Sequence, residues 1–154
     1  MKICFFCDSI FSIGGVQKVL AVIATELSKI HEITILTMDD ESVMDLNMYN
    51  LKESNIHIKF FSFIEINKWE YYTHAPFSGA YKKFLIHNRF TSYLYSLSSF
   101  PQNRRKQLIK ILNEGNYDII IGVHAFLSIK LATIRKKLNA KKVIGWMHNS
   151  YQAF

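Results

Sequence analysis

The sequence predicts an α/β protein with a Rossmann-like open parallel sheet and helices on both faces. Strand, helix and strand patterns follow one another within the first forty residues, and the same succession returns near the end of the chain. Several of these strands are short, nearly continuous apolar runs, which is typical of strands that are covered on both faces. A strand–helix–strand crossover is right-handed in about 98% of cases and places its two strands parallel in one sheet.

The first strand–helix–strand unit occupies residues 2–38. Residues 2–7 are an apolar run, and residues 32–38 alternate and are rich in β-branched side chains, so both segments predict strands. Between them, residues 16–30 repeat apolar side chains at intervals of three and four, which predicts a helix with one buried face. The predicted buried stripe consists of Val16, Val19, Leu20, Ile23 and Leu27.

The middle of the chain is less regular. Residues 39–54 are acidic and polar, and predict a loop with a short helix. Residues 56–63 alternate and predict the third strand, whereas residues 65–79 have no period. Residues 79–100 place aromatic and aliphatic side chains at helical spacing and predict a second long helix.

The last third of the chain repeats the opening pattern. Pro101 begins a predicted helix as a first-turn residue, and Gly115 ends it. Residues 117–123 predict a buried strand, residues 125–139 an amphipathic helix and residues 142–147 a final strand. The chain stops soon afterwards, where an α/β protein normally places its next helix, so we expect a fragment of a longer protein.

Length and composition exclude several classes of protein. A chain of 154 residues with 49% hydrophobic and 20% charged residues is typical of one folded domain, which we place at residues 1–154. Its longest apolar run, residues 19–25, is too short to cross a bilayer, and no secretory signal opens the chain. We therefore expect a cytoplasmic protein. Cys4 and Cys7 have a C-x-x-C spacing, but a strand would point them to opposite faces, so we expect two core cysteines.

Charge is divided unevenly along the chain. Residues 1–70 contain 6 Lys and 10 acidic residues, whereas residues 71–154 contain 13 Lys or Arg and 2 acidic residues. Residues 71–113 hold seven cations and no acid, and combine them with aromatic side chains. This segment fits an anionic membrane surface, but it also fits a solvated basic face over a core helix. No nucleic-acid-binding motif accompanies the charge, so nucleic acid is not an expected partner.

The candidate site residues follow the strands, because ligands of open α/β sheets bind outside the carboxyl ends of the strands. Gly14 and Gly15 close the loop after the first strand and begin the first helix, where free backbone N–H groups can hold a phosphate. His124 follows the strand at residues 117–123, while His148 and Asn149 follow the last strand. Taken alone, each of these features is more often structural.

The acidic residues after the second strand carry less weight. Asp39, Asp40 and Glu41 are consecutive in a polar loop, so we expect them to be solvated. We find neither the ligand spacing of a zinc site nor a catalytic triad or carboxylate pair, and we therefore expect no metal centre and no hydrolytic chemistry.

The residues that open the chain resemble family-four glycosyltransferases of the GT-B fold. The resemblance lies in a short first strand followed by SIGGVQKVLAVIATELSKIHEITILT, in which a Gly-Gly loop precedes a helix carrying a basic residue, here Lys18. The later segments YDIIIGVHAF and KVIGWMHNSY are similar to strands of that family that end near a histidine. The family usually has Gly-His where this chain has Ile30-His31, and residues 42–101 match nothing specific.

This resemblance implies the N-terminal, acceptor-side half of a GT-B fold, in a retaining enzyme that transfers a sugar from a nucleotide-sugar donor to a polysaccharide or lipid-linked acceptor. Gly14, Gly15 and Lys18 would then face the donor diphosphate. His148 would be the catalytic candidate, and His124 and Asn149 would lie on the acceptor side. The donor would be a substrate, with no cofactor, and most of its contacts would come from a C-terminal domain that this chain lacks.

A second interpretation is a module that binds a phosphate or nucleotide without catalysis, either flavodoxin-like or of another Rossmann type. Such a module would share the parallel sheet and would give more weight to the acidic cluster. Against a response-regulator-like domain, only Asp8 follows the first strand where that class has an acidic pair.

Overall fold

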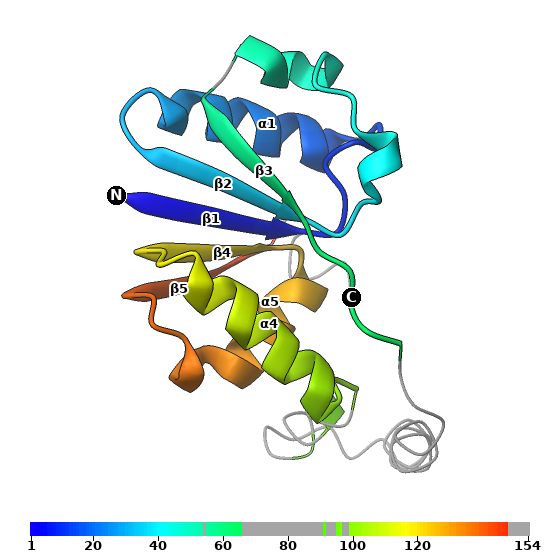
Figure 1. Ribbon diagram of the computed structural model, residues 1–154, viewed down its shortest axis with the longest axis vertical. Helices are drawn as coiled ribbons and strands as arrows, with labels where there is room; N and C mark the ends of the chain where they lie inside the picture. Colours follow the sequence, from blue (N-terminus) through cyan, green and yellow to red (C-terminus); the bar gives the residue numbers. More distant parts are fainter. Residues whose placement is uncertain (54, 66–90, 92–94, 97–98, 148–154) are drawn as a thin grey trace.

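The computed structural model describes residues 1–53, 55–65, 91, 95–96 and 99–147. In these residues five parallel strands form one sheet in the order β3-β2-β1-β4-β5 (Figure 1). The strands are β1 at Lys2–Cys7, β2 at Glu32–Thr37, β3 at Ile56–Phe60, β4 at Ile119–Val123 and β5 at Lys142–Trp146. The prediction of an α/β, Rossmann-like open parallel sheet is confirmed.

The strand order distinguishes between two kinds of doubly wound sheet. The order 3-2-1-4-5 is that of the Rossmann arrangement, whereas flavodoxin-like proteins have the order 2-1-3-4-5. The flavodoxin-like alternative is therefore wrong for this chain. The order reverses between β1 and β4, so the carboxyl ends of these two strands mark the position where such sheets bind ligands.

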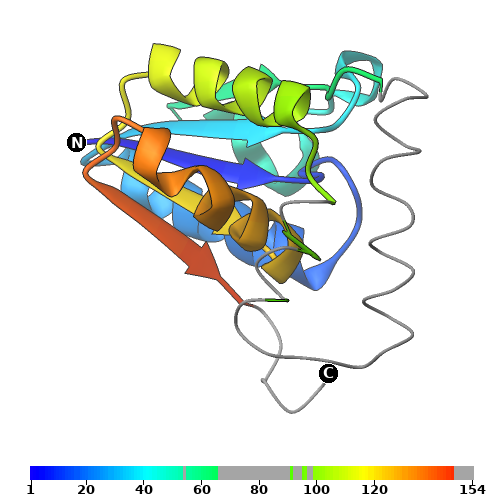
Figure 2. The ribbon, with the colours of Figure 1, turned by 90° about the horizontal axis from the view of Figure 1, so that it is seen from below.

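Each face of the sheet is covered by its own helices. Helix α1 at Gly15–Ser28 packs on one face against β2 and β3, and the second face carries α4 at Gln102–Glu114 and α5 at Ala125–Ile134. Figure 2 shows α5 in front of the sheet and α1 behind it. None of the described helices is long and apolar enough to cross a membrane.

Two hydrophobic cores result, one on each face. Cys7 belongs to the core beneath α1, and Cys4 to the core beneath α4 and α5. Both are free and buried on opposite faces, as predicted, and burial raises the pKa of the Cys4 thiol to about 12 and also raises that of Cys7. Thiols held this firmly in their neutral form are core side chains, not redox groups.

Helix α1 is rotated relative to the predicted stripe. Its buried side chains are Leu20, Ala21 and Ala24, whereas Val19 and Ile23 are 46% and 37% exposed. Of the predicted stripe, Leu20 is buried and Val16 and Leu27 pack against the core, so the prediction was wrong for Val19 and Ile23 only. This helix is apolar around most of its circumference from residue 19 to 24, so the pattern alone does not fix which face turns inward. The two alanines allow the helix to lie close to the sheet.

Several predicted boundaries shift. Strand β3 ends at Phe60, because residues 62–64 leave the sheet and bond to α4: the Gln107 amide donates to Ser62 O (2.8 Å) and accepts from Ile64 N (3.0 Å). Helix α5 ends at Ile134 and tightens into a 3₁₀ turn, η3, at Arg135–Lys137, so it is shorter than the predicted 125–139.

The remaining segments also differ in detail. Pro101 caps α4 and is not its first helical residue. Two short 3₁₀ segments, η1 at Glu41–Val43 and η2 at Met48–Glu53, occupy the stretch predicted as a loop with a short helix. The predicted helix at 79–100 lies almost entirely outside the described residues.

Candidate functional site

The loop between β1 and α1 forms the centre of the candidate site. Gly14 caps α1 with its backbone and has no side chain to make a cap hydrogen bond, and the first turn contains no acidic residue. The first N–H groups of the helix therefore lack partners within it, and they lie at the positive end of the helix dipole. This end of α1 provides backbone donors for an anion at the carboxyl edge of β1.

The two glycines play different parts. The backbone of Gly14 is extended, with φ of −172°, and a Cβ there would contact the end of the flexible Gln17 side chain. A Cβ on Gly15 would meet no atom within 4 Å. No described glycine has a positive φ. Neither backbone strain nor crowding requires glycine at position 15, and the space in front of it is open.

Lys18 lies one turn further along α1. Its backbone N–H donates to Gly14 O (3.1 Å), and its side chain is exposed. Among the described residues the Lys18 ammonium has no ion-pair partner. Its charge is thus available at the start of the same helix.

Asp39 holds the loop in place from the end of β2. Its Oδ2 accepts hydrogen bonds from Ile10 N (2.8 Å), Phe11 N (3.2 Å) and the Thr37 hydroxyl (2.7 Å). Burial alone would raise the pKa of Asp39, but these bonds and one from the Ser9 side chain outweigh it, and the pKa is lowered. Asp39 is therefore an ionised clamp between β2 and the loop.

The expectation that the acidic cluster is simply solvated is thus wrong for Asp39. It holds better for the other two members: Asp40 and Glu41 are both exposed, and Asp40 accepts from Ser42 N (2.9 Å) at the start of η1. The sequence could not distinguish the three consecutive acidic residues. Their roles differ because the backbone N–H groups of the loop at residues 8–14 bond to Asp39 and not to the other two.

Tyr49 fixes the glycine end of the loop. Its hydroxyl donates to Ser12 O (2.9 Å) and accepts from Gly14 N (3.1 Å), so η2 is tied to the N-terminus of α1. Tyr49 and Asn50 both adopt left-handed backbone conformations, with φ of 57° and 58°. Sequence reasoning missed Tyr49, because nothing in the polar stretch before it indicates a contact 35 residues away.

His124 lies beside Asp8 where β4 meets α5. Its Nε2 is 3.9 Å from Asp8 Oδ1, and its backbone N–H donates to Trp146 O (3.1 Å) at the end of β5. His124 has φ of 80° and ψ of 150°, a region that is costly for a residue with a side chain. Ser128 supports this conformation by donating its hydroxyl to His124 O (2.8 Å).

The candidate residues therefore divide into two groups. Topology brings Gly14, Gly15 and His124 to one edge of the sheet, and the Asp8–His124 distance joins the ends of β1 and β4 directly. His148 and Asn149 lie outside the described residues, so their predicted roles stay predictions. Chemically, this edge combines donors for an anion with an imidazole beside a carboxylate, a pair suited to holding or moving a proton.

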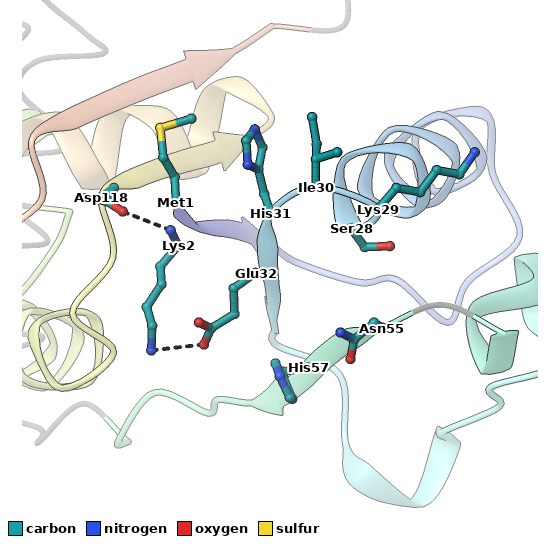
Figure 3. A pocket seen from close by; sticks show the side chains of 10 residues that line it. All are labelled: Met1, Lys2, Ser28, Lys29, Ile30, His31, Glu32, Asn55, His57 and Asp118. Atoms are coloured by element: carbon teal, nitrogen blue, oxygen red, sulfur yellow. Dashed lines mark hydrogen bonds and ion pairs between the residues drawn. The ribbon is translucent and has the colours of Figure 1, made fainter.

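A separate hollow lies at the opposite, amino edge of the sheet (Figure 3). It has a volume of about 610 Å³, and its charges are already paired: Lys2 bonds Glu32 (3.0 Å), the Lys2 N–H donates to Asp118 (2.9 Å), and Lys29 bonds Glu26 (2.7 Å). Within the described part of the chain, no group of three or more His, Cys, Asp or Glu side chains could hold a metal ion. The carboxyl edge remains the candidate site.

Comparison with known proteins gives one informative result. No family model matches the chain, and no curated protein matches it. Among solved structures, the chain is similar to the apo form of the lipopolysaccharide outer core galactosyltransferase WaaB. The alignment has a TM-score of 0.50 and 19% sequence identity, and it covers 100% of this chain and 35% of that one.

The five-strand Rossmann-like α/β fold is similar to part of that galactosyltransferase. This likeness shows the fold alone, and the assignment to family four stays a prediction. The chain spans about a third of the length of the galactosyltransferase.

Proposed function

We propose that this chain is the acceptor-side domain of a retaining glycosyltransferase, which transfers a sugar from a nucleotide-sugar donor to a polysaccharide or lipid-linked acceptor. The observation that carries the proposal is the open N-terminus of α1. The N-terminal N–H groups of α1 and the empty space before Gly15 suit a diphosphate at the carboxyl edge of a glycosyltransferase-like fold. Lys18, which has no ion-pair partner among the described residues, adds a positive charge. The donor is a substrate here, and the reaction uses no further cofactor.

The chemistry required at this edge is charge stabilisation. When a sugar leaves a nucleotide diphosphate, negative charge develops on the departing phosphate oxygens, and fixed N–H groups with a nearby cation stabilise it. Gly14, Gly15 and Lys18 supply these groups. His124, oriented beside Asp8, and Asn149 serve the acceptor side, while His148 borders the reacting sugar. A second domain contributes most of the donor contacts.

A lipid-linked acceptor would lie at a membrane surface. We assign the enzyme to the cytoplasm, peripheral on the inner face of the cell membrane, with the basic and aromatic segment 71–113 against anionic lipid. Each cation near such a surface contributes about 1 kcal/mol at low salt. Liposome co-sedimentation tests this part alone: binding that requires anionic lipid, and weakens when Lys82, Lys83 and Arg89 become Gln, supports it. Absence of binding even at low salt removes the membrane from the proposal.

The decisive experiment is a turnover assay of the full-length protein with a panel of nucleotide sugars and glycan acceptors. We expect turnover with one donor, lost on His148→Ala and reduced on Lys18→Gln. Lys29→Gln is the matched control, because Lys29 lies at the other end of α1 and pairs with Glu26. Nucleotide binding without turnover for every donor would instead identify a Rossmann-type phosphate-binding module.

A further inference from the structure

A groove between α4 and α5 lies on the outer side of the second core. Its volume is about 410 Å³. The first half of α4 forms one wall, and the end of α5 with η3 forms the other. Its lining residues are Gln102, Arg105, Lys106, Ile109, Thr133, Ile134 and Lys137. None of them belongs to the candidate site at the carboxyl edge, so the groove needs an explanation of its own.

The groove collects positive charge without a counter-charge. Arg105, Lys106 and Lys137 line it, and no acidic residue does. Within the described part of the chain none of these three cations takes part in an ion pair, whereas Lys110 on the same helix pairs with Glu114. Three cations around one hollow repel one another, and an anion bound between them relieves this repulsion.

Arg105 carries the clearest sign of an absent partner. Its Nε is buried and has no hydrogen-bond partner among the residues that the structure describes. The neighbouring Arg104 does use its Nε, which donates to Ile64 O (2.9 Å). Buried donors in folded proteins are nearly always satisfied, so the unpaired Nε sets Arg105 apart. Its guanidinium lines the groove, and guanidinium groups are suited to bind oxyanions.

The sequence of α4 also departs from helix preference at this place. The first turn of α4 contains no acid, and Arg104, Arg105 and Lys106 follow within its first five residues. Cations are disfavoured at the positive end of a helix dipole, so this arrangement costs stability when the groove is empty. Local rules are broken in this way mainly where a function requires it.

We propose that the α4–α5 groove binds a phosphate monoester group or inorganic phosphate through Arg105, Lys106 and Lys137. The guanidinium offers parallel N–H donors, the two ammonium groups act as point charges, and the Gln102 amide adds a further donor. Ile109 and Ile134 form an apolar wall, which leaves room for the organic part of a phosphate ester.

The test is a titration of the ¹⁵N-labelled chain with inorganic phosphate, following the Nε–Hε resonances of its arginines by NMR. Arg105→Lys assigns the resonance of Arg105. We expect a saturable shift of that resonance, and no shift with chloride at equal ionic strength. Lys106→Gln combined with Lys137→Gln weakens binding about tenfold, because two charge-assisted contacts are lost.

A matched control changes the same charge outside the groove. Lys110→Gln combined with Lys136→Gln removes two exposed cations from α4 and η3 that do not line it, and leaves the affinity within about twofold. An equal loss in both double variants, a response to chloride equal to that to phosphate, or a shift that does not saturate overturns the proposal. The two variants alter exposed side chains only, so both are expected to fold.

Two sources can supply such a phosphate, and two further arms separate them. One arm uses glycerol 3-phosphate, and the other uses phosphatidylcholine vesicles containing phosphatidic acid. If the Arg105 resonance shifts at a lower phosphate concentration with the vesicles than with glycerol 3-phosphate, the ligand is a lipid headgroup. If it shifts at a lower concentration with glycerol 3-phosphate, the ligand is a soluble ester. Vesicles that contain phosphatidylglycerol are the control, because this lipid carries a phosphodiester. If they give the same response as phosphatidic acid, and the response depends on Lys106 and Lys137, recognition of a monoester is contradicted.

Discussion

Three glycines of this chain have different surroundings, which decide what a side chain at each position would do. A Cβ on Gly115 would contact the Tyr117 ring, and one on Gly122 would lie 2.8 Å from Leu131 Cδ1 and 3.1 Å from the Ser128 backbone. A Cβ on Gly15 would meet nothing within 4 Å. Close packing therefore accounts for glycine at positions 115 and 122. Packing does not account for glycine at position 15, and we attribute it to the bound donor.

Gly15→Val in the full-length enzyme is expected to reduce turnover by tenfold or more, while the free energy of unfolding changes by less than about 1 kcal/mol. The added side chain would occupy the space that we assign to the donor diphosphate, and no residue of the fold is displaced. Steady-state kinetics and thermal melts separate the two effects. Equal turnover at saturating donor would mean that this loop is only a turn.

Gly122→Ala is the matched control for that prediction. Its methyl group overpacks the contact between β4 and α5, and overpacking typically costs about 1–3 kcal/mol. This variant should therefore lower the melting temperature more than Gly15→Val does, and should lower turnover less.

Asp39→Asn tests the clamp between β2 and the loop. Removing the charge weakens three hydrogen bonds to one oxygen, and we expect a loss of about 1–2 kcal/mol at pH 7. Because the folded-state pKa of Asp39 is lowered, the ionised carboxyl stabilises the fold above its unfolded pKa, near 3.9. This contribution disappears as pH falls through the folded-state pKa.

Urea unfolding of both proteins between pH 2.5 and 7 measures this difference. It should be constant above about pH 5 and should shrink below pH 4. Asp40→Asn is the control, since Asp40 is exposed and an asparagine can still accept from Ser42 N. A difference that stays constant down to pH 2.5 would show that the charge of Asp39 contributes nothing.

At the scale of elements, the sequence predicted which segments are helices and strands better than it predicted how they face. Strand β1 has its predicted bounds, because a strand buried on both faces is a plain apolar run. Helix α1 was placed correctly, and Leu20 is buried as predicted. The predicted Val19 and Ile23 are exposed, and the small side chains of Ala21 and Ala24 are buried in their place. Tertiary packing decides between such stripes.

The face of α5 that packs on Phe63 and Phe100 contains a buried cation that the sequence did not predict. Lys130 is 8% exposed, and its ammonium lies 3.8 Å from the Phe126 ring centroid and about 5 Å from those of Phe63 and Phe100. Burial, and then the nearby charge of Arg104, lower the pKa of Lys130 to about 8. A lysine on the inner face of an amphipathic helix is usually expected to extend its ammonium group to solvent at the edge of that face.

Lys130→Met is expected to stabilise the fold at pH 7, by about 1 kcal/mol or less, because solvent still screens part of the charge. Lys130 holds its proton less tightly in the folded than in the unfolded state, whose pKa is near 10.4. Stability of the wild type should therefore rise as pH increases from about 8 to 10.4, and this rise should be smaller in the variant.

Urea unfolding at pH 7 and pH 9.5 makes the comparison. Lys110→Met is the control, since Lys110 is an exposed lysine of α4 that pairs with Glu114. If the aromatic rings compensate fully for burial of the charge, Lys130→Met will be less stable than the wild type at pH 7, which contradicts the prediction.

For the whole molecule, strand order accounts for most of what could be predicted about the site. Parallel strands place their carboxyl ends at one edge, so Gly14, Gly15 and His124 were found from their positions after β1 and β4 alone. Of the residues that fix this edge, Tyr49 was not predicted from the sequence and Asp39 was given no role. Tyr49 of η2 bonds to Gly14 N, and Asp39 bonds to Ile10 N in the loop after β1. Neither contact follows from a periodic pattern in the sequence.

One face of the sheet is also incompletely covered by the described residues. Beside α1, an apolar hollow of about 250 Å³ opens over β1, β4 and β5. Its lining residues are Phe5, Ile23, Leu27, Ile121, Ile144, Gly145 and Trp146. Parallel sheets are normally covered on both faces, and the chain spans 35% of the galactosyltransferase that it resembles in fold. Both observations agree with our proposal that this domain works as part of a larger protein.

The isolated chain is therefore expected to fold but to transfer no sugar. The two cores and the five-strand sheet of its described residues should give a cooperative unfolding transition by circular dichroism. Its candidate site offers groups for one side of a donor diphosphate only, so we expect turnover at background with every nucleotide sugar that the full-length protein uses. Assaying both proteins side by side at equal concentration, with Gly15→Val as a further control, makes the comparison. Turnover by the isolated chain above that of heat-denatured protein would refute the two-domain account, because the residues described above would then suffice for the reaction.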